Sequence, residues 1–575
     1  MIVSKRIPPV VFLLLALFLA QGVFLAFTNS TVSDEVAHIP AGYTYLKYHD
    51  FKINPEHPPL AKQIAAIPLM FMDLKFPDNI PAWKDGDGEQ WELGRTFLYR
   101  IGNPAEKIIF YSRLALLPLA LILGLALFFW IRELIGEPAA IFAVFLYSYF
   151  PEMIIHASLV TTDFAGAVFH FTAFYCLYMF FKYGSRRFLF AAGVSGGFAL
   201  LSKFSMLQIL PLFYFFSLII AFFRSKDTEP LPFSIPVLAL ITFFTVFHVT
   251  SVLIFAAPVT FFWVHRFFPR LPVFRHPKIR TAMSIVLVLL SISFLIVALG
   301  YFEPALWFKK FRPFKRFFRG WAIFRDHSIK MQHPGFLLGE RSVKGWWYYY
   351  LLAMLVKIPI AVWILSLLGA AAALTKRYFS KIDWVFLLVP PLAFLFIASF
   401  INKVNIGVRH VLPVYPYLLV FAAAGFHFLW ITKKTFISRS AAVLLSLWVV
   451  ISSALAFPNY LTYFNEFAAA FGGSYNILND SNISWGQDLK RLKVYVDKSG
   501  IPEVKTILMF NFPDELDYYK IHWVKGEQDF KERKPGVYVL DVFNYYSMIK
   551  DKEYAWLKNK KPDAKVGGSL WIYKL

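Results

Sequence analysis

Residues 8–27 read PPVVFLLLALFLAQGVFLAF, an uncharged and almost wholly apolar stretch. A helix of roughly 20 such residues crosses about 30 Å of hydrocarbon, so this stretch predicts a membrane span. Lys5 and Arg6 before it would also suit a secretory signal, but the apolar run is long for one and no convincing small-residue cleavage site follows. We therefore expect residues 8–27 to form the first membrane anchor.

The rest of the chain repeats this pattern. Of its 575 residues, 58% are hydrophobic and 17% charged, against roughly 25% charged in a soluble domain, which excludes a soluble globular protein and a disordered one. The single cysteine, Cys176, excludes an internal disulfide. The predicted fold class is a polytopic α-helical membrane protein with about 13 transmembrane helices, the later ones at 108–134, 139–156, 163–181, 188–202, 205–223, 231–248, 251–264, 282–300, 346–374, 384–400, 411–431 and 441–457.

The distribution of Lys and Arg predicts the orientation, because cytoplasmic loops collect these residues. They gather in alternate connections, around 5–6, 132, 182–187, 224–226, 266–280, 376–381 and 433–439. The series holds only if the apolar run 231–264 is two short spans that separate at His248. We expect a cell (inner or plasma) membrane protein with a cytoplasmic N-terminus and an extracytoplasmic C-terminus.

The composition changes at Pro458, where charges become frequent and apolar runs shorten. We therefore expect two domains: a transmembrane domain at 1–457, with outer loops at 28–107 and 301–345, and a small extracytoplasmic α/β domain at 458–575. In the second domain we expect strands at 504–510, 536–543 and 569–575, and helices near 488–498 and 546–558.

The outer loop 301–345 carries ten Lys or Arg and three acidic residues. Within it, 306–321 alternates aromatic and basic residues. Two interpretations stay open: an interfacial helix lying on anionic lipid, or an electropositive funnel for a phosphate-bearing lipid. Both place this segment at the membrane surface.

Ionisable residues at the ends of apolar spans are costly unless they have a purpose. Under the predicted orientation they collect on the outer side, with Lys357 placed deeper: Asp34, Glu35, His38, His57, Lys62, Asp163, Lys203, Arg409 and His410. A carboxylate can accept the proton of an attacking hydroxyl while cations stabilise a departing phosphate, and sugar transfer from a lipid phosphate needs both. The alternative for Asp34 and Asp163 is that each caps the start of a helix, and the alternative for Lys203 and Lys357 is that each extends to the membrane interface.

Several motifs containing these residues resemble a known family. They are SDEVAH (33–38), NPEHPPLAK (54–62), TTD (161–163), LSK (201–203), FLLG (336–339) with GWWYY (345–349), NIGVRHVLP (405–413) and DSNISWGQDL (480–489). Together they resemble the protein O-mannosyltransferase and aminoarabinose-transferase group of the GT-C superfamily, the polyprenyl-phosphate-dependent glycosyltransferases. The first outer loop is the most specific piece.

The resemblance implies an inverting transfer from a sugar-phosphoryl polyprenol to a hydroxyl of a protein, lipid or glycan. It implies Asp34 as general base, Glu35 as an acceptor-binding neighbour and Asp163 as a second acid. It also implies donor sugar or phosphate contacts by His57, Lys62, Lys203 and Arg409, beside which His410 and Lys357 are further phosphate candidates. The chain lacks the MIR-type insertion of eukaryotic protein mannosyltransferases, so the acceptor stays open.

We expect no cofactor, although two acids and a histidine could hold Mg²⁺ or Mn²⁺. The expected partners are the prenyl-phosphate donor, the acceptor and membrane lipid, and no nucleic acid. The alternatives are a transporter or flippase of a lipid-linked saccharide, which would place ionisable residues near the midplane, and a membrane receptor.

Overall fold

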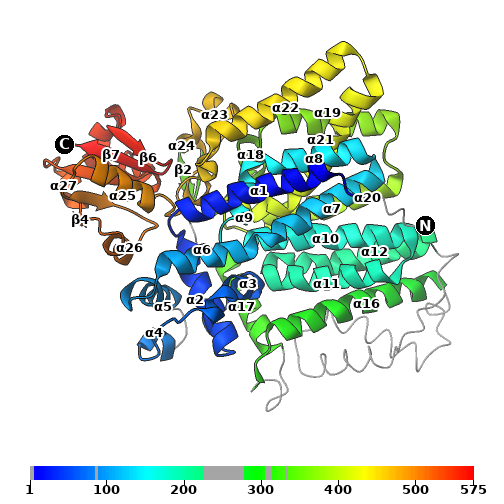
Figure 1. Ribbon diagram of the computed structural model, residues 1–575, viewed down its shortest axis with the longest axis horizontal. Helices are drawn as coiled ribbons and strands as arrows, with labels where there is room; N and C mark the ends of the chain where they lie inside the picture. Colours follow the sequence, from blue (N-terminus) through cyan, green and yellow to red (C-terminus); the bar gives the residue numbers. More distant parts are fainter. Residues whose placement is uncertain (1–5, 85–88, 225–276, 305–313, 331–333) are drawn as a thin grey trace.

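The apolar stretches form long helices packed side by side (Figure 1). The computed structural model describes residues 6–84, 89–224, 277–304, 314–330 and 334–575. The first helix, α1, starts at Pro9, where a fixed φ suits a helix start and the missing N–H costs no bond. The helices of this body are α1 (Pro9–Thr28), α6 (Ala105–Leu116), α7 (Pro118–Leu134), α8 (Glu137–Ser148), α9 (Pro151–Ala157), α10 (Thr162–Tyr183), α11 (Arg186–Ser202), α12 (Ile209–Arg224), α16 (Pro277–Gly300), α18 (Tyr349–Lys357), α19 (Ile360–Lys376), α20 (Lys381–Phe396), α21 (Tyr415–His427) and α22 (Phe436–Ala456).

Within the described residues, eight helical stretches are long and apolar enough to cross a membrane, or ten if two bent pairs each count as one span. The bends are 65° between α8 and α9 and 110° between α18 and α19. Each bend has a proline, Pro151 and Pro359, which disfavours helix at the residue before it. The stretch predicted at 188–202 is the 17-residue helix α11, and those predicted at 231–248 and 251–264 lie outside the described residues.

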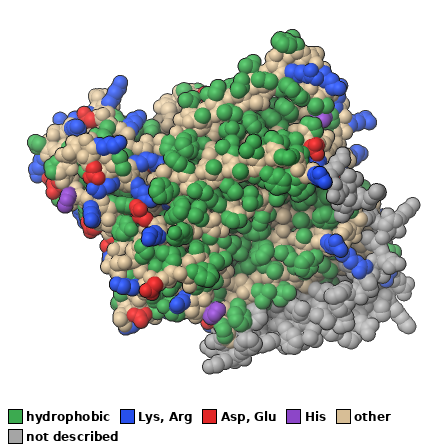
Figure 2. Space-filling model, in the orientation of Figure 1, with side chains coloured by type: hydrophobic (Ala, Val, Ile, Leu, Met, Phe, Trp, Pro, Cys, Tyr) green, Lys and Arg blue, Asp and Glu red, His purple; other side chains and the backbone are tan. Residues whose placement is uncertain are grey.

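A broad apolar surface covers the face of the helical body seen in Figure 2, and charged side chains collect toward its two ends. Exposed apolar side chains such as Leu13 on α1, Leu367 on α19 and Leu455 on α22 point outward, which suits contact with lipid and not with water. The chain is a multi-pass membrane protein, and the predicted fold class is confirmed.

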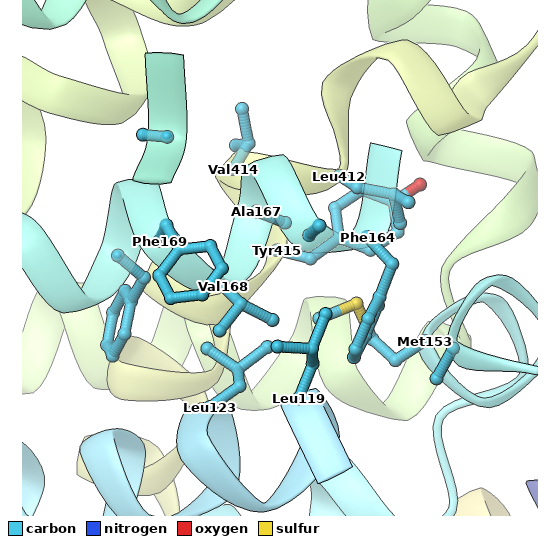
Figure 3. Packing of buried hydrophobic residues seen from close by; sticks show 14 of the residues in the cluster. Leu119, Leu123, Met153, Phe164, Ala167, Val168, Phe169, Leu412, Val414 and Tyr415 are labelled. Atoms are coloured by element: carbon cyan, nitrogen blue, oxygen red, sulfur yellow. The ribbon is translucent and has the colours of Figure 1, made fainter. Parts of the chain in front are cut away.

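One part of the hydrophobic core lies where α7, α9 and α10 meet the turns Val408–Val414 (η6) and the start of α21 (Figure 3). Leu119 and Leu123 of α7 face Val168 of α10 in this cluster, and all are buried. This packing holds the start of α10 against η6, and both segments carry residues of the candidate site.

Short helices of the first outer loop lie at the end of the body that also carries the C-terminal domain (Figure 1). Arg100 joins the two regions, because its Nε donates to Oδ1 of Asp514 at 2.6 Å. The elements of the two outer loops are α2 (Ser33–Lys47), α3 (Leu60–Ala66), α4 (Pro81–Lys84), α5 (Gln90–Arg95), α17 (Lys315–Lys330) and the hairpin β1 (Gly335–Leu337) and β2 (Glu340–Ser342). The helix expected at 306–321 is thus described from Lys315 and continues to Lys330, while 305–313 lie outside the described residues.

The C-terminal domain is a five-stranded mixed sheet in the order β4-β3-β5-β7-β6. β3 is parallel to β4 and β5, and β7 is antiparallel to β5 and β6. Side chains alternate between two cores: Tyr538 and Leu540 pack on one face, and Val539 with Ile572 packs against α25 on the other. The elements are α23 (Phe467–Ala470), α24 (Ser474–Ile477), α25 (Leu489–Lys498), β3 (Val504–Ile507), α26 (Pro513–Tyr518), β4 (Trp523–Lys525), α27 (Glu527–Lys531), β5 (Val537–Asp541), α28 (Val542–Met548), β6 (Ala564–Val566) and β7 (Leu570–Lys574).

The predicted α/β character of this domain is confirmed. The three expected strands are present with shorter bounds, as β3, β5 and β7. β4 and β6 were not predicted, because each has only three residues and so shows little alternation.

Candidate active site

Asp34 lies in the first turn of α2, which follows the C-terminal end of α1 after a short turn. Its neighbour Glu35, not Asp34, closes the start of the helix, since Oε2 of Glu35 accepts from the backbone N–H of Val32 at 2.9 Å. The capping role that the sequence left open for Asp34 is therefore filled by Glu35. The Asp34 carboxylate keeps 19% of its surface exposed.

Arg409 joins Asp34 to Asp163. Its Nη1 donates to Oδ2 of Asp34 at 3.0 Å and to Oδ2 of Asp163 at 3.1 Å. Asp163 stands in the first turn of α10, and Lys203, just after α11, donates to its other oxygen. Four residues from four distant segments thus form one cluster, as the sequence predicted for the outer ends of these spans.

The cluster holds two carboxylates and two cations at different depths. The side chain of Asp163 is 1% exposed and Arg409 and Lys203 are nearly as buried, whereas Asp34 is the accessible carboxylate. Buried charges are tolerated when they are paired and hydrogen-bonded, which is the case here. Asp34 is consequently the acid that can meet a substrate, and Asp163 is the acid that holds the two cations.

Glu35 lies behind this cluster and is fully buried. Its carboxylate pairs with Arg113 of α6, at 2.5 Å between Oε2 and Nη2, and Oε1 accepts from the backbone of Val160 at 2.9 Å. Every oxygen of Glu35 is engaged, so it fixes α2 against α6 and the turn before α10. In this structure Glu35 supports Asp34 and does not face an acceptor.

Arg113 was missed by the sequence reasoning, although a signal existed. It is a charged residue inside the predicted span 108–134, and a charge in an apolar span usually has a specific partner. Its guanidinium also donates to the carbonyls of Ala26, Asn29 and Ser30, which ties the end of α1 to the start of α2.

Lys62 also lies outside the cluster. Its Nζ donates to the Tyr45 hydroxyl, to both oxygens of Asn54 and to the His57 carbonyl, at 2.6–2.9 Å. Burial lowers the pKa of Lys62 to about 7. Lys62 orders the turn that carries His57. Its amine is enclosed by oxygens of the protein, which does not suit the donor contact that the resemblance implied for Lys62.

His57 and His38 form an edge-to-face pair, with ring centroids 5.1 Å apart. The His38 Nδ1 lies 2.9 Å from the carbonyl of Val160. Desolvation, and then the neighbouring His38, Lys62 and Lys203, hold the pKa of His57 well below its usual range. A neutral His57 suits a sugar hydroxyl better than a phosphate.

Lys357 belongs to a separate buried cluster. Its Nζ lies 2.9 Å from Oε1 of Glu152 and donates to the carbonyls of Leu461, Tyr463 and Asn482 at 2.8–2.9 Å. The side chain is 0% exposed, so it makes neither a phosphate contact nor an interfacial extension of the kind the sequence suggested. Lys357 thus anchors the segment that follows α22 to α18 through these three carbonyls.

A cavity of about 260 Å³ lies next to the cluster and is lined by Lys203 of the cluster and by His410, the residue after Arg409. The apolar wall comes mainly from α17, from Phe394 at the end of α20 and from the turn Ile397–Ile401 that follows α20. The lining residues are Lys203, Phe204, Ser205, Leu207, Gln208, Trp321, Phe324, Arg325, Ser328, Phe394, Ile397, Ala398, Ile401, Asn402 and His410. A mostly apolar space that borders on the cation Lys203 fits an apolar chain that carries an anionic head.

The cluster does not fit a divalent cation. Such an ion takes about six oxygen ligands, whereas both carboxylates here already face Arg409 or Lys203. Among the described parts of the chain, no group of three or more His, Cys, Asp and Glu side chains is arranged to hold a metal. No chemical step is therefore assigned to a metal.

Comparison with known proteins supports the resemblance seen in the motifs. Residues 95–248 match the family described as dolichyl-phosphate-mannose-protein mannosyltransferase. The chain is thus similar over this stretch to a family of membrane glycosyltransferases, and the predicted resemblance is confirmed. No curated protein sequence matches the chain.

Solved structures of similar architecture are more distant. One is ArnT from Cupriavidus metallidurans bound to undecaprenyl phosphate, with 12% identity, a TM-score of 0.42 and coverage of 98% of this chain and 97% of that one. Another is the oligosaccharyltransferase of Archaeoglobus fulgidus in the apo form, with 12% identity, a TM-score of 0.45 and coverage of 94% and 71%.

Proposed function

We propose that this protein transfers a sugar from a polyprenyl-phosphate donor to a hydroxyl acceptor, with Asp34 as general base. The observation that carries the proposal is the Arg409 nitrogen that reaches both Asp34 and Asp163 beside an apolar cavity. The match of residues 95–248 to a mannosyltransferase family supports the same reaction class.

The donor phosphate would lie between Lys203 and Arg409, with its prenyl chain in the cavity. Both cations are already held by Asp163, so they need little reorganisation when the dianionic leaving group forms. The neutral His57 would contact the sugar.

The chemical step would be a single displacement. Asp34 takes the proton of the acceptor hydroxyl as its oxygen bonds to the anomeric carbon, and the bond from that carbon to the phosphate oxygen breaks. The electron pair leaves with the prenyl phosphate, and the configuration at the anomeric carbon inverts. The proton then passes from Asp34 to solvent, to which it is exposed.

We place the site on the extracytoplasmic side, with the N-terminus cytoplasmic and residues 458–575 outside. The alternation of Lys and Arg between successive connections supports this orientation. The acceptor, whether protein, lipid or glycan, and the sugar stay open.

The test uses the purified full chain and a panel of prenyl-phosphate sugars, and measures release of free prenyl phosphate. Wild type should release it in the presence of an acceptor, and Asp34→Asn should lose about 10²–10⁴-fold of the rate. Asp73→Asn, an exposed acid of the same outer loop, is the matched control. Unchanged transfer in Asp34→Asn would exclude this base, and movement of intact lipid without sugar release would indicate a flippase.

A further inference from the structure

The residues just before α25 form a buried loop between the helical body and the sheet domain. Residues 480–488, here called the 480–488 loop, read DSNISWGQD, and every one of them is buried. Such a polar segment has no packing reason to be buried unless its groups have partners. Its partners lie on both sides of the candidate active site.

On one side the loop holds Arg409. The ring of Trp485 stacks on the guanidinium, with 4.1 Å between the ring centroid and Cζ. The Oγ of Ser481 accepts from Nε of Arg409 at 3.2 Å and donates to the carbonyl of Ile406 at 2.9 Å. Asn482 accepts from the backbone N–H of Val408 at 2.9 Å.

On the other side the loop holds the start of α2. The carbonyl of Trp485 accepts from the backbone N–H of Ser33 at 2.8 Å, one residue before Asp34. The carbonyl of Gln487 accepts from the N–H of Ser30 at 3.0 Å, and the Ser30 hydroxyl donates to Gly486. Trp485 therefore touches Arg409 with its ring and the segment before Asp34 with its backbone.

These contacts decide where Nη1 of Arg409 points. An arginine side chain is long and flexible, and a planar stack together with a bond at Nε fixes the plane of its guanidinium. With Nε held by Ser481, Nη1 reaches both acids. The packing is tight, because a Cβ at Gly407 would lie 2.4 Å from the Ser481 Oγ.

We infer that Trp485 and Ser481 are positioning residues of the catalytic centre: they set the guanidinium of Arg409 between Asp34 and Asp163, so the segment after the last span completes the site. The inference rests on the proposed function for its kinetic consequences. Neither residue touches the reacting atoms, and both act through Arg409.

The kinetic test compares Trp485→Leu, which removes the aromatic face, with Trp485→Phe, which keeps one. Trp485→Leu should raise the KM for the prenyl-phosphate sugar and the Kd for undecaprenyl phosphate about tenfold or more. Trp485→Phe should stay within about threefold of wild type, as should the control Trp523→Leu on β4. Equal losses in the Leu and Phe variants, or an unchanged Kd in Trp485→Leu, would overturn the inference.

Ser481→Ala covers the case in which Trp485→Leu does not fold, because it removes only the acceptor for Nε. It should raise the same KM and Kd by a smaller factor, with less change in kcat. An unchanged KM and Kd would remove Ser481 from the positioning pair.

A substrate-free experiment separates this inference from the proposed function. Melting temperatures of Arg409→Ala, Trp485→Leu and the double variant form a mutant cycle in detergent. A double variant that melts higher than additivity predicts supports the stack, even if the wild type transfers no sugar and the proposed function fails. Strict additivity would show that Trp485 does not hold Arg409.

Discussion

Asp34 and Asp163 accept hydrogen bonds from the same nitrogen, Nη1 of Arg409, at 3.0 and 3.1 Å. The two carboxylates therefore share one counter-charge, and among the described residues Asp163 alone of the two pairs with a second cation, Lys203. This asymmetry separates their expected roles. Asp34 has an exposed face for an acceptor, and Asp163 organises the cations for the leaving phosphate.

The first prediction concerns Asp163→Asn. Removing this charge takes away the carboxylate that holds Lys203 and Arg409 in place, so the two cations are less well positioned for the leaving phosphate. Their electrostatic attraction for the phosphate does not weaken. We expect kcat to fall about 10²–10³-fold, with the Kd for undecaprenyl phosphate unchanged or lower. Transfer assays and equilibrium binding measure the two effects, and a Kd that rises tenfold would contradict this role.

The second prediction compares two buried lysines. Lys203→Met should weaken undecaprenyl phosphate binding, since Lys203 lines the cavity. Lys357→Met should instead lower stability, because it leaves Glu152 buried without its cation, at a cost on the order of 3–5 kcal/mol. Melting curves and binding assays on both variants distinguish the roles. If Lys357→Met folded normally and lost only undecaprenyl phosphate binding, the assignment of Lys357 to a structural cluster apart from the donor site would be wrong.

The third prediction tests the cavity as the prenyl site. Ala398 is buried in its wall, and Ala398→Phe would fill part of the space of about 260 Å³. We expect the KM for a long-chain donor to rise at least tenfold, and less for a donor with a short prenyl chain. Leu367→Phe on the exposed face of α19 is the control. An equal KM for both chain lengths in Ala398→Phe would place the prenyl chain elsewhere.

The fourth prediction tests orientation by cysteine labelling. The native cysteine, Cys176, is buried, so an impermeant thiol reagent should give little background. Ser499→Cys in the sheet domain should react in intact cells, and Lys433→Cys between α21 and α22 should react only after lysis. The reverse pattern would invert the topology and move the site to the cytoplasmic side.

The candidate cluster was predictable because the position of a residue relative to an apolar run predicts its depth in the membrane. Asp34 and Lys203 follow an apolar run, whereas Asp163 and Arg409 precede or open one. Because successive spans run in opposite directions, counting the spans places all four near one surface. Which of them touch is a question of packing in the plane of the membrane. Span counting therefore could not place Lys357 in the Glu152 pair or Glu35 in the Arg113 pair.

The fold was likewise predictable in part. Apolar length identified the spans, but 139–156 and 346–374 were each expected as one stretch, and the structure bends both. Pro151 and Pro359 mark the bends, although a proline alone does not say whether a helix kinks or turns by 110°. Trp485 belongs to the motif DSNISWGQDL (480–489). Its contact with Arg409 joins positions 76 residues apart in the chain, and a local sequence pattern does not predict such a contact.

The fifth prediction concerns the pH dependence of the contact between the sheet domain and the first outer loop. Glu515 of α26 is buried there and accepts from the Tyr99 hydroxyl at 2.9 Å and from Asn511 at 3.1 Å. Burial raises the pKa of Glu515 from 4.5 to about 7. Because the folded-state pKa is the higher one, its stabilising contribution is complete below about pH 4.5 and is lost as the pH rises toward 7.

Glu515→Gln should remove this titration, since the amide resembles the protonated acid and the Tyr99 hydroxyl can accept from it while donating to Thr31, 2.7 Å away. Between pH 5 and 8 the wild type should lose up to about 3 kcal/mol relative to the variant. Asp541, whose pKa burial also raises to about 7, titrates in both proteins and cancels in the difference. Melting temperatures across this range measure the effect, with the exposed Glu503→Gln as control. Parallel pH profiles for wild type and Glu515→Gln would show that Glu515 is ionised throughout and does not make the domain contact sensitive to pH.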